Sequence, residues 1–267
     1  MVTTTAMVPI MVARGNKHSS LINTAVHLFS TSRTIAESGL LKGMTDYHCH
    51  ILPGVDDGMK TMDESLVILH QMESQGIRKV WLTPHVMEDI PNTTLALQEK
   101  FEELETAYRG AMELNLAAEY MMDNLFEERL EAGDLLPLRE GYRQYLLVET
   151  SCFNPPMNLV STLKHIQAKG YRPLLAHPER YQYMDIPDYR ALKHEGIAFQ
   201  LNLPSLTGVY GVHAQKKAAS LLKAGMYDLT GTDMHSPENF RVWLGTRIGS
   251  RERGMLSARF QACRDGL

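Results

Sequence analysis

Residues 46–58 carry the sequence DYHCHILPGVDDG, in which a short apolar strand at 45–48 is expected to end at a pair of histidines. His48 and His50 are two residues apart, so in an extended chain both side chains point to the same face. A single histidine in an apolar setting is more often a hydrogen-bonded core residue. Two imidazoles on one face instead favour a metal site.

Downstream of this segment the chain repeats one unit: an amphipathic helix, a glycine, and a short apolar strand that ends in a polar residue. The glycines Gly76, Gly170, Gly196 and Gly225 fall where a helix needs a left-handed residue after its last turn. Strands are predicted at 45–48, 79–83, 116–120, 145–149, 172–176, 197–201 and 227–230, and helices at 62–75, 93–114, 157–169, 186–194 and 213–224. Strands that alternate with helices indicate a parallel sheet, and this number of strands favours a barrel. We predict a single α/β domain.

The predicted strand ends carry the residue types that bind divalent metals. Besides the first histidine pair, they supply His85, Glu119, Glu149, His177, Asp233 and His235, and the loop after the first strand supplies Asp56 and Asp57. Side chains at the carboxyl ends of barrel strands converge on one site. Imidazoles and carboxylates without thiolates suit Zn²⁺, Mn²⁺ or Fe²⁺, and the set exceeds what a single catalytic ion needs. We therefore predict two or three ions.

Some of these candidates have a simpler explanation. Asp56 and Asp57 precede Gly58 and could form a turn, so only one of the two is expected to be a ligand, and Asp57 is our choice. Glu119 and Glu149 lie in apolar strands, where a carboxylate is costly unless it is paired or bound to metal. For these two we favour the metal site.

Two arginines are candidates for binding an anion beside the metals. Arg180 follows His177 by three residues, and Arg241 follows the segment 233–235. A guanidinium can bind the equatorial oxygens of a phosphoryl group through two parallel hydrogen bonds. Clustered ions can supply hydroxide and hold the attacking and leaving oxygens of an in-line displacement. The residues therefore predict hydrolysis of a phosphoester.

The composition excludes several other classes. The 267 residues carry a net charge of −4, without the basic field of a nucleic-acid-binding protein, and no apolar run is long enough to span a membrane. The cysteines Cys49, Cys152 and Cys263 show no paired spacing, which favours a reducing cytoplasm. A cysteine-based tyrosine phosphatase needs an arginine six residues after its nucleophile. Val55 and Asn158 occupy that position after Cys49 and Cys152.

The segment 1–36 contains no acidic residue and is rich in serine and threonine. We expect a poorly ordered N-terminal extension there, followed by the catalytic domain at 37–267. A targeting peptide is the alternative, but the apolar stretch is interrupted and no cleavage site of small residues follows it.

Taken together, the motifs resemble those of the PHP (polymerase and histidinol phosphatase) superfamily, and within it the bacterial protein-tyrosine phosphatases of capsular and exopolysaccharide gene clusters. The matching segments are DYHCHILPGVDDG (46–58), LTPH (82–85), AAEYMMD (117–123), LVETS (147–151), AHPER (176–180), QLN (200–202) and GTDMH (231–235). Where the family often has a small polar residue between the paired histidines, this chain has Cys49, which should point away from the metals.

The resemblance implies a distorted (β/α)7 TIM-like barrel in a cytoplasmic enzyme with a three-metal centre, usually of manganese, with iron or zinc as alternatives. Arg180 would bind the phosphate, and the ligands would be His48, His50, Asp57, His85, Glu119, Glu149, His177, Asp233 and His235. The implied substrate is phosphotyrosine on a tyrosine autokinase that controls polysaccharide synthesis. A histidinol-phosphate or other small-molecule phosphatase could use the same site, and so could a non-catalytic metal-binding or kinase-docking protein. The sequence does not indicate an oligomeric state.

Overall fold

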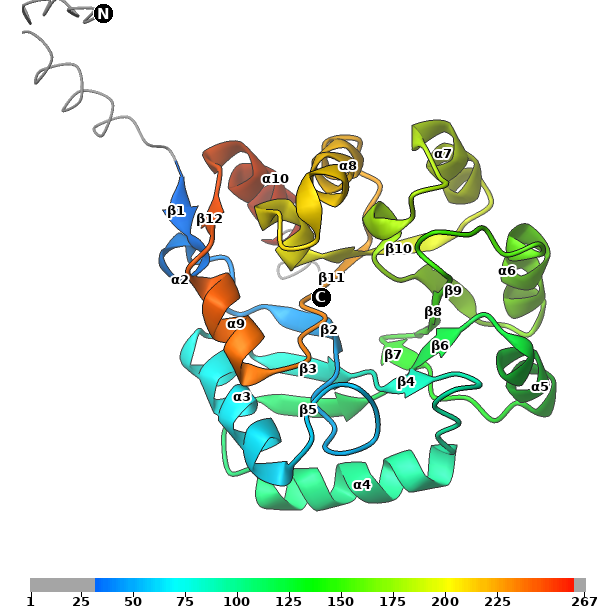
Figure 1. Cartoon of the computed structure of the whole chain (residues 1–267), viewed down its shortest axis with the longest axis horizontal. Coiled ribbons are helices and arrows are strands. Elements are labelled where there is room, and N and C mark those ends of the chain that lie inside the picture. The colour runs from blue at the N-terminus through cyan, green and yellow to red at the C-terminus, as the bar shows by residue number, and fades with distance from the viewer. Residues whose placement is uncertain (1–31, 262–267) are drawn as a thin grey trace, which may run out of the picture.

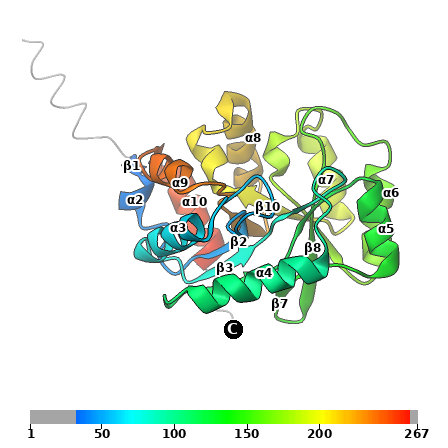
Figure 2. The ribbon, with the colours of Figure 1, turned by 60° about the horizontal axis from the view of Figure 1, so that its bottom comes forward.

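The structure is a computed structural model that describes residues 32–261, and it has the α/β architecture expected from the sequence (Figure 1). Parallel strands form a curled sheet in the centre, and helices lie outside it (Figures 1 and 2). One path of hydrogen-bonded neighbours runs through β11 (Leu229–Gly231), β10 (Ala198–Asn202), β9 (Arg172–Leu175), β8 (Arg143–Glu149), β6 (Glu119–Met121) and β4 (His85–Val86). A second path runs through β2 (Thr45–Cys49), β3 (Lys79–Leu82) and β5 (Glu113–Leu116). The short strand β7 (Leu138–Glu140) pairs antiparallel with β8.

The two paths are joined through the backbone on both sides. On one side, β3 is followed after two residues by β4, and β5 is followed after two residues by β6, so the same chain segments serve both paths. On the other side, the amide nitrogens of Thr232 and Asp233 donate to the carbonyl oxygen of His48 at 3.2 and 2.7 Å. The amide nitrogen of His50 donates to the carbonyl oxygen of Met234 at 3.0 Å. β2 and β11, the first and last strands of the curled sheet, therefore lie side by side.

Asp46 fixes this junction between β2 and β11 from inside the protein. Its Oδ1 accepts hydrogen bonds from the amide nitrogens of Thr232 at 2.9 Å and His48 at 3.2 Å, and its Oδ2 accepts one from the Thr232 hydroxyl at 2.6 Å. The side chain is fully buried, and burial raises the pKa of Asp46 to about 6 although these hydrogen bonds lower it. A buried carboxylate is tolerated when its lone pairs are satisfied in this way.

The helices that connect the strands cover the outside of the sheet (Figure 2). They are α3 (Met62–Ser74), α4 (Thr94–Ala107), α5 (Asn124–Ala132), α6 (Leu159–Ala168), α7 (Ile186–His194) and α8 (Gly211–Lys223), with α9 (Pro237–Leu244) and α10 (Ser250–Gln261) after the last strand of the curled sheet. The capping box of Thr61 and Glu64 opens α3, as its sequence indicates. The four glycines expected after helices all have positive φ, between 67° and 89°. Within residues 32–261, no helix is long and apolar enough to cross a membrane.

The structure corrects the prediction of one long helix at 93–114. The helix α4 ends at Ala107, and β5 occupies 113–116. Glu73 of α3 explains the early end, because its carboxylate accepts hydrogen bonds from the Tyr108 hydroxyl at 2.8 Å and the Ala111 amide nitrogen at 2.7 Å. This contact between distant segments cannot be read from the local pattern. The single strand predicted at 116–120 is instead the two strands β5 and β6, and the elements α5, α9, β4 and β7 were not predicted.

Residues 33–36, at the end of the segment expected as an extension, pack against the rest of the chain. Residues 1–31 of the expected extension lie outside the described residues. The strand β1 (Arg33–Thr34) pairs antiparallel with β12 (Arg247–Ile248), and α2 (Ile35–Ser38) follows it. Ile35 is buried, and its amide nitrogen donates to the carbonyl oxygen of Thr246 at 2.9 Å. We therefore propose a single domain that begins near Arg33 rather than at residue 37.

The Asp46 junction provides a stability test. We expect Thr232→Val to lower the free energy of unfolding by about 1–3 kcal/mol, because it removes a hydroxyl donor from a buried carboxylate at nearly constant volume. Thr230→Val is the matched control, since Thr230 is buried in β11, two residues before Thr232, and its side chain has no hydrogen bond to the described residues. Urea unfolding of both variants measures the difference. Equal stability of the two variants would contradict the role of Asp46.

Candidate metal centre

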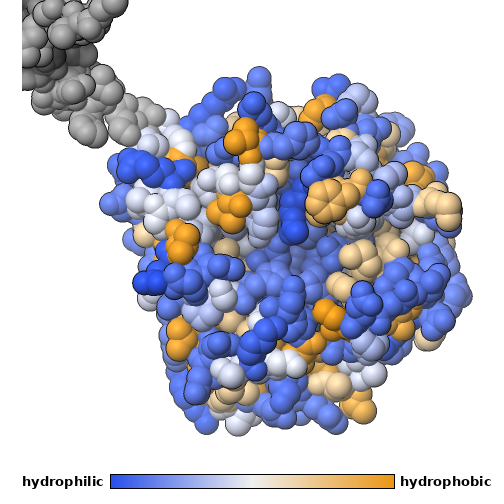
Figure 3. Space-filling view, in the orientation of Figure 1, coloured by the Kyte–Doolittle hydropathy of each residue, from blue (hydrophilic) through white to orange (hydrophobic). Residues whose placement is uncertain are grey.

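The nine candidate ligands converge at the carboxyl ends of the strands, where the molecular surface is hollowed and hydrophilic (Figure 3). Their ligand atoms form four groups, within each of which all atoms lie within 4.8 Å of one another. The groups are His50, Asp57, His85 and His235; His48, Glu119 and His177; His48, His50 and Asp233; and His85, Glu119 and Glu149. Four residues occur in two groups each. The groups are therefore adjacent and share side chains, as expected where several ions lie close together.

Glu119, in β6, lies at the centre of the cluster and is fully buried. Its Oε2 is 3.1 Å from Nε2 of His48, 3.3 Å from Nε2 of His50 and 3.2 Å from Nδ1 of His85. Its Oε1 is 3.1 Å from Nε2 of His177. Burial raises the pKa of Glu119, but the surrounding histidines, His48 foremost, outweigh burial and hold the pKa well below its usual range.

The contact between the two histidines of the first strand shows that the cluster fits a cation. Nδ1 of His48 faces Oε1 of Gln200 at 3.0 Å, and Nδ1 of His50 faces Oδ2 of Asp56 at 2.9 Å. Both partners are acceptors, so each Nδ1 carries the hydrogen and each Nε2 is left with its lone pair. The two Nε2 atoms are only 3.1 Å apart. Two lone pairs at this distance repel each other, and a proton or a metal ion bound by these nitrogens removes that repulsion.

Unsatisfied polar atoms support the same conclusion. Nδ1 of His85, Oε2 of Glu119 and Nδ1 of His177 are buried and, in spite of close neighbours, have no partner in hydrogen-bonding geometry among residues 32–261. Buried polar atoms normally have partners, and exceptions often mark a missing ion. The side chains present at this site therefore suit divalent metals.

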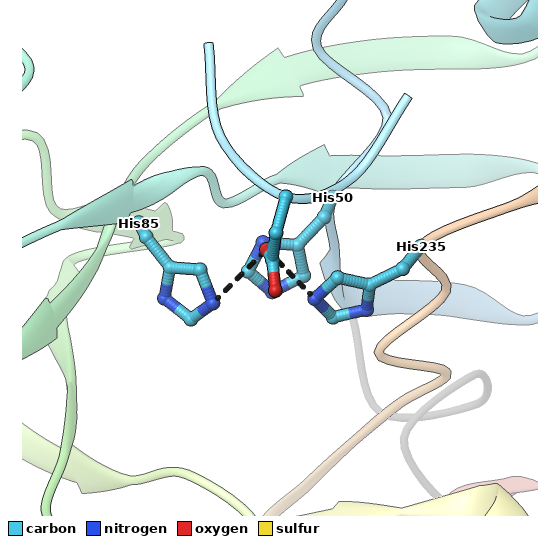
Figure 4. Close-up of side chains that lie close together, drawn as sticks. His50, His85 and His235 are labelled. Carbon is cyan, nitrogen blue, oxygen red and sulfur yellow. Dashed lines mark ion pairs between the residues drawn. The ribbon is translucent and has the colours of Figure 1, made fainter. Parts of the chain in front are cut away.

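Asp57 belongs to the more open side of the cluster. Its Oδ1 forms ion pairs with Nε2 of His85 at 3.6 Å and Nε2 of His235 at 3.3 Å, drawn as dashed lines in Figure 4. Ligand atoms of His50, His85 and His235 lie within 4.8 Å of one another and of this carboxylate, and Figure 4 shows the three rings gathered together. Nδ1 of His235 donates to the carbonyl oxygen of Asp233 at 2.8 Å, which leaves Nε2 for Asp57. The hydrogen bond from His235 holds the pKa of Asp57 below its usual value.

Two residues that position the histidines were not recognised from the sequence. Asp56 holds Nδ1 of His50 and also accepts a hydrogen bond from the amide nitrogen of His85 at 3.0 Å. Gln200 holds Nδ1 of His48 and accepts a hydrogen bond from the amide nitrogen of His177 at 3.1 Å. Such partners set the tautomer and the orientation of ligating imidazoles. A glutamine in the middle of an apolar strand was the signal that could have revealed one of them.

The backbone is strained at two of the candidate ligands. His177 (φ 31°) and Asp233 (φ 53°) are the only residues other than glycine with positive φ in the described part of the chain. This conformation costs about 1–2 kcal/mol for a residue with a side chain. Residues held in this way often lie at functional sites, where the surrounding contacts determine their positions.

The structure brings one of the two candidate arginines to the cluster. Nη1 of Arg180 donates to Oδ2 of Asp233 at 2.9 Å, and the guanidinium lies over the ring of Tyr210 at 4.7 Å. Arg241 lies on α9 with 70% of its side chain exposed, and it pairs with Glu238 one turn away. Although Arg241 follows the last candidate ligands closely in the sequence, α9 directs it toward solvent.

The residue between the paired histidines points away from the cluster, as expected. Cys49 is fully buried in the hydrophobic core, and its thiol donates to the carbonyl oxygen of Trp81 at 3.4 Å. Burial raises the pKa of this thiol well above its usual value, so it stays protonated. Cys49 therefore fills space behind the site.

The fold and the cluster define a class of protein: a curled parallel α/β domain with a histidine- and carboxylate-rich site at its strand ends, suited to several divalent ions. Comparison with known families is more specific. The model of the capsular polysaccharide synthesis family CpsB/CapC matches residues 44–244, and the chain belongs to this family. The resemblance found in the sequence motifs is thereby confirmed.

Characterised relatives agree with this assignment. The tyrosine-protein phosphatase YwqE of Bacillus subtilis is 28% identical over 221 residues, covering 79% of this chain and 85% of YwqE. The tyrosine-protein phosphatase CpsB of Streptococcus pneumoniae is 30% identical over 208 residues, covering 72% of this chain and 83% of CpsB. A solved structure from a study of these two proteins, described there as unique metal-dependent tyrosine phosphatases, superposes with a TM-score of 0.68 at 26% identity. The match covers 81% of this chain and 87% of that one.

The protons held by the cluster give a prediction about pH. Burial lowers the pKa of His48, but Glu119 and Asp233 raise it from 6.5 to about 9. In the metal-free protein, the attraction between protonated His48 and these two carboxylates stabilises the fold fully below about pH 6.5. This contribution is lost as the pH rises through about 9. Metal must displace these protons, so its affinity should rise over the same range. The increase in melting temperature on adding Mn²⁺ to chelator-treated protein should therefore grow with pH, and an increase that shrinks would contradict this account.

Proposed function

We propose that this protein is a metal-dependent protein-tyrosine phosphatase that hydrolyses phosphotyrosine on a protein substrate. The observation that carries the proposal is the position of Arg180, whose guanidinium lies at the edge of a cluster of histidines and carboxylates suited to several divalent ions. Membership of the CpsB/CapC family and similarity to two tyrosine-protein phosphatases support the choice of substrate.

The metal would be held by His48, His50, Asp57, His85, Glu119, Glu149, His177, Asp233 and His235, as two or three divalent ions. Manganese is the ion that the family resemblance favours, and the same ligands would accept iron or zinc. When bound, such ions supply an activated water for attack at phosphorus and neutralise charge on the phosphoryl oxygens.

Arg180 would bind the phosphoryl group of the substrate. One of its terminal nitrogens is engaged by Oδ2 of Asp233, which fixes the guanidinium plane and leaves other N–H groups for oxygens of the substrate. Oδ2 of Asp233 also accepts hydrogen bonds from Nδ2 of Asn202 at 2.8 Å and from the Tyr210 hydroxyl at 3.2 Å. With Oδ2 held by three donors, Oδ1 is left facing Nε2 of His50 at 3.3 Å. Asp233 can thereby connect the anion-binding arginine to the metal cluster.

The substrate itself helps the reaction. Tyrosine has a pKa of about 10, so its phenolate leaves far more readily than an alkoxide. Strong protonation of the leaving oxygen is therefore not required of the protein. The main tasks of the chain are to orient the phosphoryl group and to stabilise its charge.

We extend the proposal to the cellular setting. The substrate we expect is a bacterial tyrosine kinase that controls capsular or exopolysaccharide synthesis, and the compartment we expect is the cytoplasm. The described cysteines, Cys49 and Cys152, are both free thiols, which supports a reducing compartment. We also propose that the curled sheet is best counted as a distorted (β/α)7 barrel, because the backbone hydrogen bonds of His48 connect its first and last strands.

The substrate class can be tested with the metal restored. We expect the purified protein to hydrolyse a phosphotyrosine peptide, to lose this activity after chelation, and to regain it with Mn²⁺. Histidinol phosphate should be hydrolysed far more slowly. Release of phosphate from both compounds, measured before and after adding the metal, makes the comparison. Faster hydrolysis of histidinol phosphate would favour a small-molecule phosphatase instead.

The two candidate arginines form a matched pair for mutagenesis. Arg180→Ala should lower kcat/KM for the phosphotyrosine peptide by about 10²-fold or more, since it removes a preorganised donor to the developing charge. Arg241→Ala should stay within about twofold of wild type, because a surface ion pair contributes little. Steady-state kinetics of both variants, with metal content checked, measures the effect. Similar losses in the two variants would contradict the role of Arg180.

A further inference from the structure

We propose that a cavity beside Arg180 binds the aromatic ring of the substrate, and that Val209 and Val242 determine the preference for aryl over alkyl phosphates. The inference rests on the proposed phosphatase function and deepens it by assigning the part of the site that recognises the leaving group. The cavity has a volume of about 280 Å³ and lies between the loop before α8 and the helix α9.

The residues that line this cavity are of two kinds. Arg180, Asp233 and His235 line it and connect it to the metal cluster. Val209, Val242 and Trp243 also line it and are apolar. A phosphate ester of a phenol has the same polarity, with a charged group at one end and an apolar ring at the other. A phosphoryl group at Arg180 would therefore leave the ring facing the valines.

The valines are available for a ligand. Val209 is 51% exposed and Val242 is 59% exposed, although both border the hollow that contains the cluster. Hydrophobic residues can be seen at the rim of this hydrophilic hollow in Figure 3. Single exposed valines are common on protein surfaces. Here two of them, from different elements, line one cavity beside a phosphate-binding candidate, and a ring between them would remove apolar surface from water.

A backbone turn fixes the position of Val209 in the cavity wall. Gly208 (φ 83°) and Gly211 (φ 87°) adopt left-handed conformations on either side of Val209 and Tyr210. The amide nitrogen of Gly211 donates to the carbonyl oxygen of Gly208 at 2.9 Å, which closes the turn. Tyr210 also lies under the guanidinium of Arg180. The same turn therefore places an apolar wall and supports the phosphate-binding arginine.

The charges around the cavity argue against a cationic leaving group. Asp233 is the only acidic residue among those that line it, and its Oδ2 already accepts hydrogen bonds from Arg180, Asn202 and Tyr210. An amino alcohol phosphate would place its ammonium group between Val209 and Val242 without a carboxylate partner. A neutral aromatic ring meets no such cost.

The test compares two inert analogues, phenylphosphonate and methylphosphonate, as ligands of the full chain loaded with Mn²⁺. We expect wild type to bind phenylphosphonate roughly tenfold more tightly, a preference that corresponds to partial burial of one ring. The double variant Val209→Ser, Val242→Ser should lose most of this preference while binding methylphosphonate within about twofold of wild type. Calorimetry measures the four affinities. For phosphotyrosine peptide, KM should rise more than kcat falls.

Val212→Ser is the control, because Val212 is 64% exposed on α8 and does not line the cavity. The single variant Val242→Ser, with metal content equal to wild type, guards against a folding defect in the double variant. The inference is overturned if wild type shows no preference for phenylphosphonate, if the double variant keeps the preference, or if both analogues weaken equally. Phosphonate binding with the expected selectivity but without hydrolysis of phosphotyrosine would instead defeat the proposed function and leave the ring-binding cavity supported.

Discussion

Glu119 has no exposed surface, and its two oxygens lie 3.1 to 3.3 Å from ring nitrogens of four histidines. A buried carboxylate is strongly destabilising unless positive charge or hydrogen bonds surround it. The histidines come from three separate regions of the sequence, at the end of β2, at β4 and after β9, so the charge of Glu119 is compensated only when the sheet has curled. The electrostatics of the site and the closure of the fold therefore depend on one another.

Alternating side chains along β2 contribute both to the charge of the site and to the closure of the sheet. Asp46, His48 and His50 are spaced by two residues along the chain. Asp46 binds Thr232 and so holds the first strand against the last, while the two histidines extend the same edge into the cluster. The carbonyl oxygen of His48 also accepts the amide hydrogens of Thr232 and Asp233. A change in register here would displace candidate ligands and the closure of the sheet together.

The site also separates charge from apolar surface over a short distance. Asp233 contacts histidines through one oxygen, and Arg180, Asn202 and Tyr210 donate to its other oxygen. Val209, which precedes Tyr210 in the chain, lines a cavity that α9 also borders. The anion-binding position that we propose at Arg180 is thus bordered by candidate metal ligands and by apolar residues. This arrangement suits an aryl phosphate better than a small polar ester.

The sequence by itself determined the alternation of strands and helices, the helix-ending glycines and the set of candidate ligands, because these depend on local backbone preferences and on residue type at strand ends. The capping box at Thr61 and the left-handed Gly76 are where the sequence indicates. Only the tertiary structure decided which polar residue does what. In the structure, Asp56 contacts His50 while Asp57 contacts His235, and Gln200 contacts His48. Arg241 faces solvent, and α4 ends early where the chain contacts Glu73. Those outcomes depend on distances between residues far apart in the chain, which no local pattern encodes.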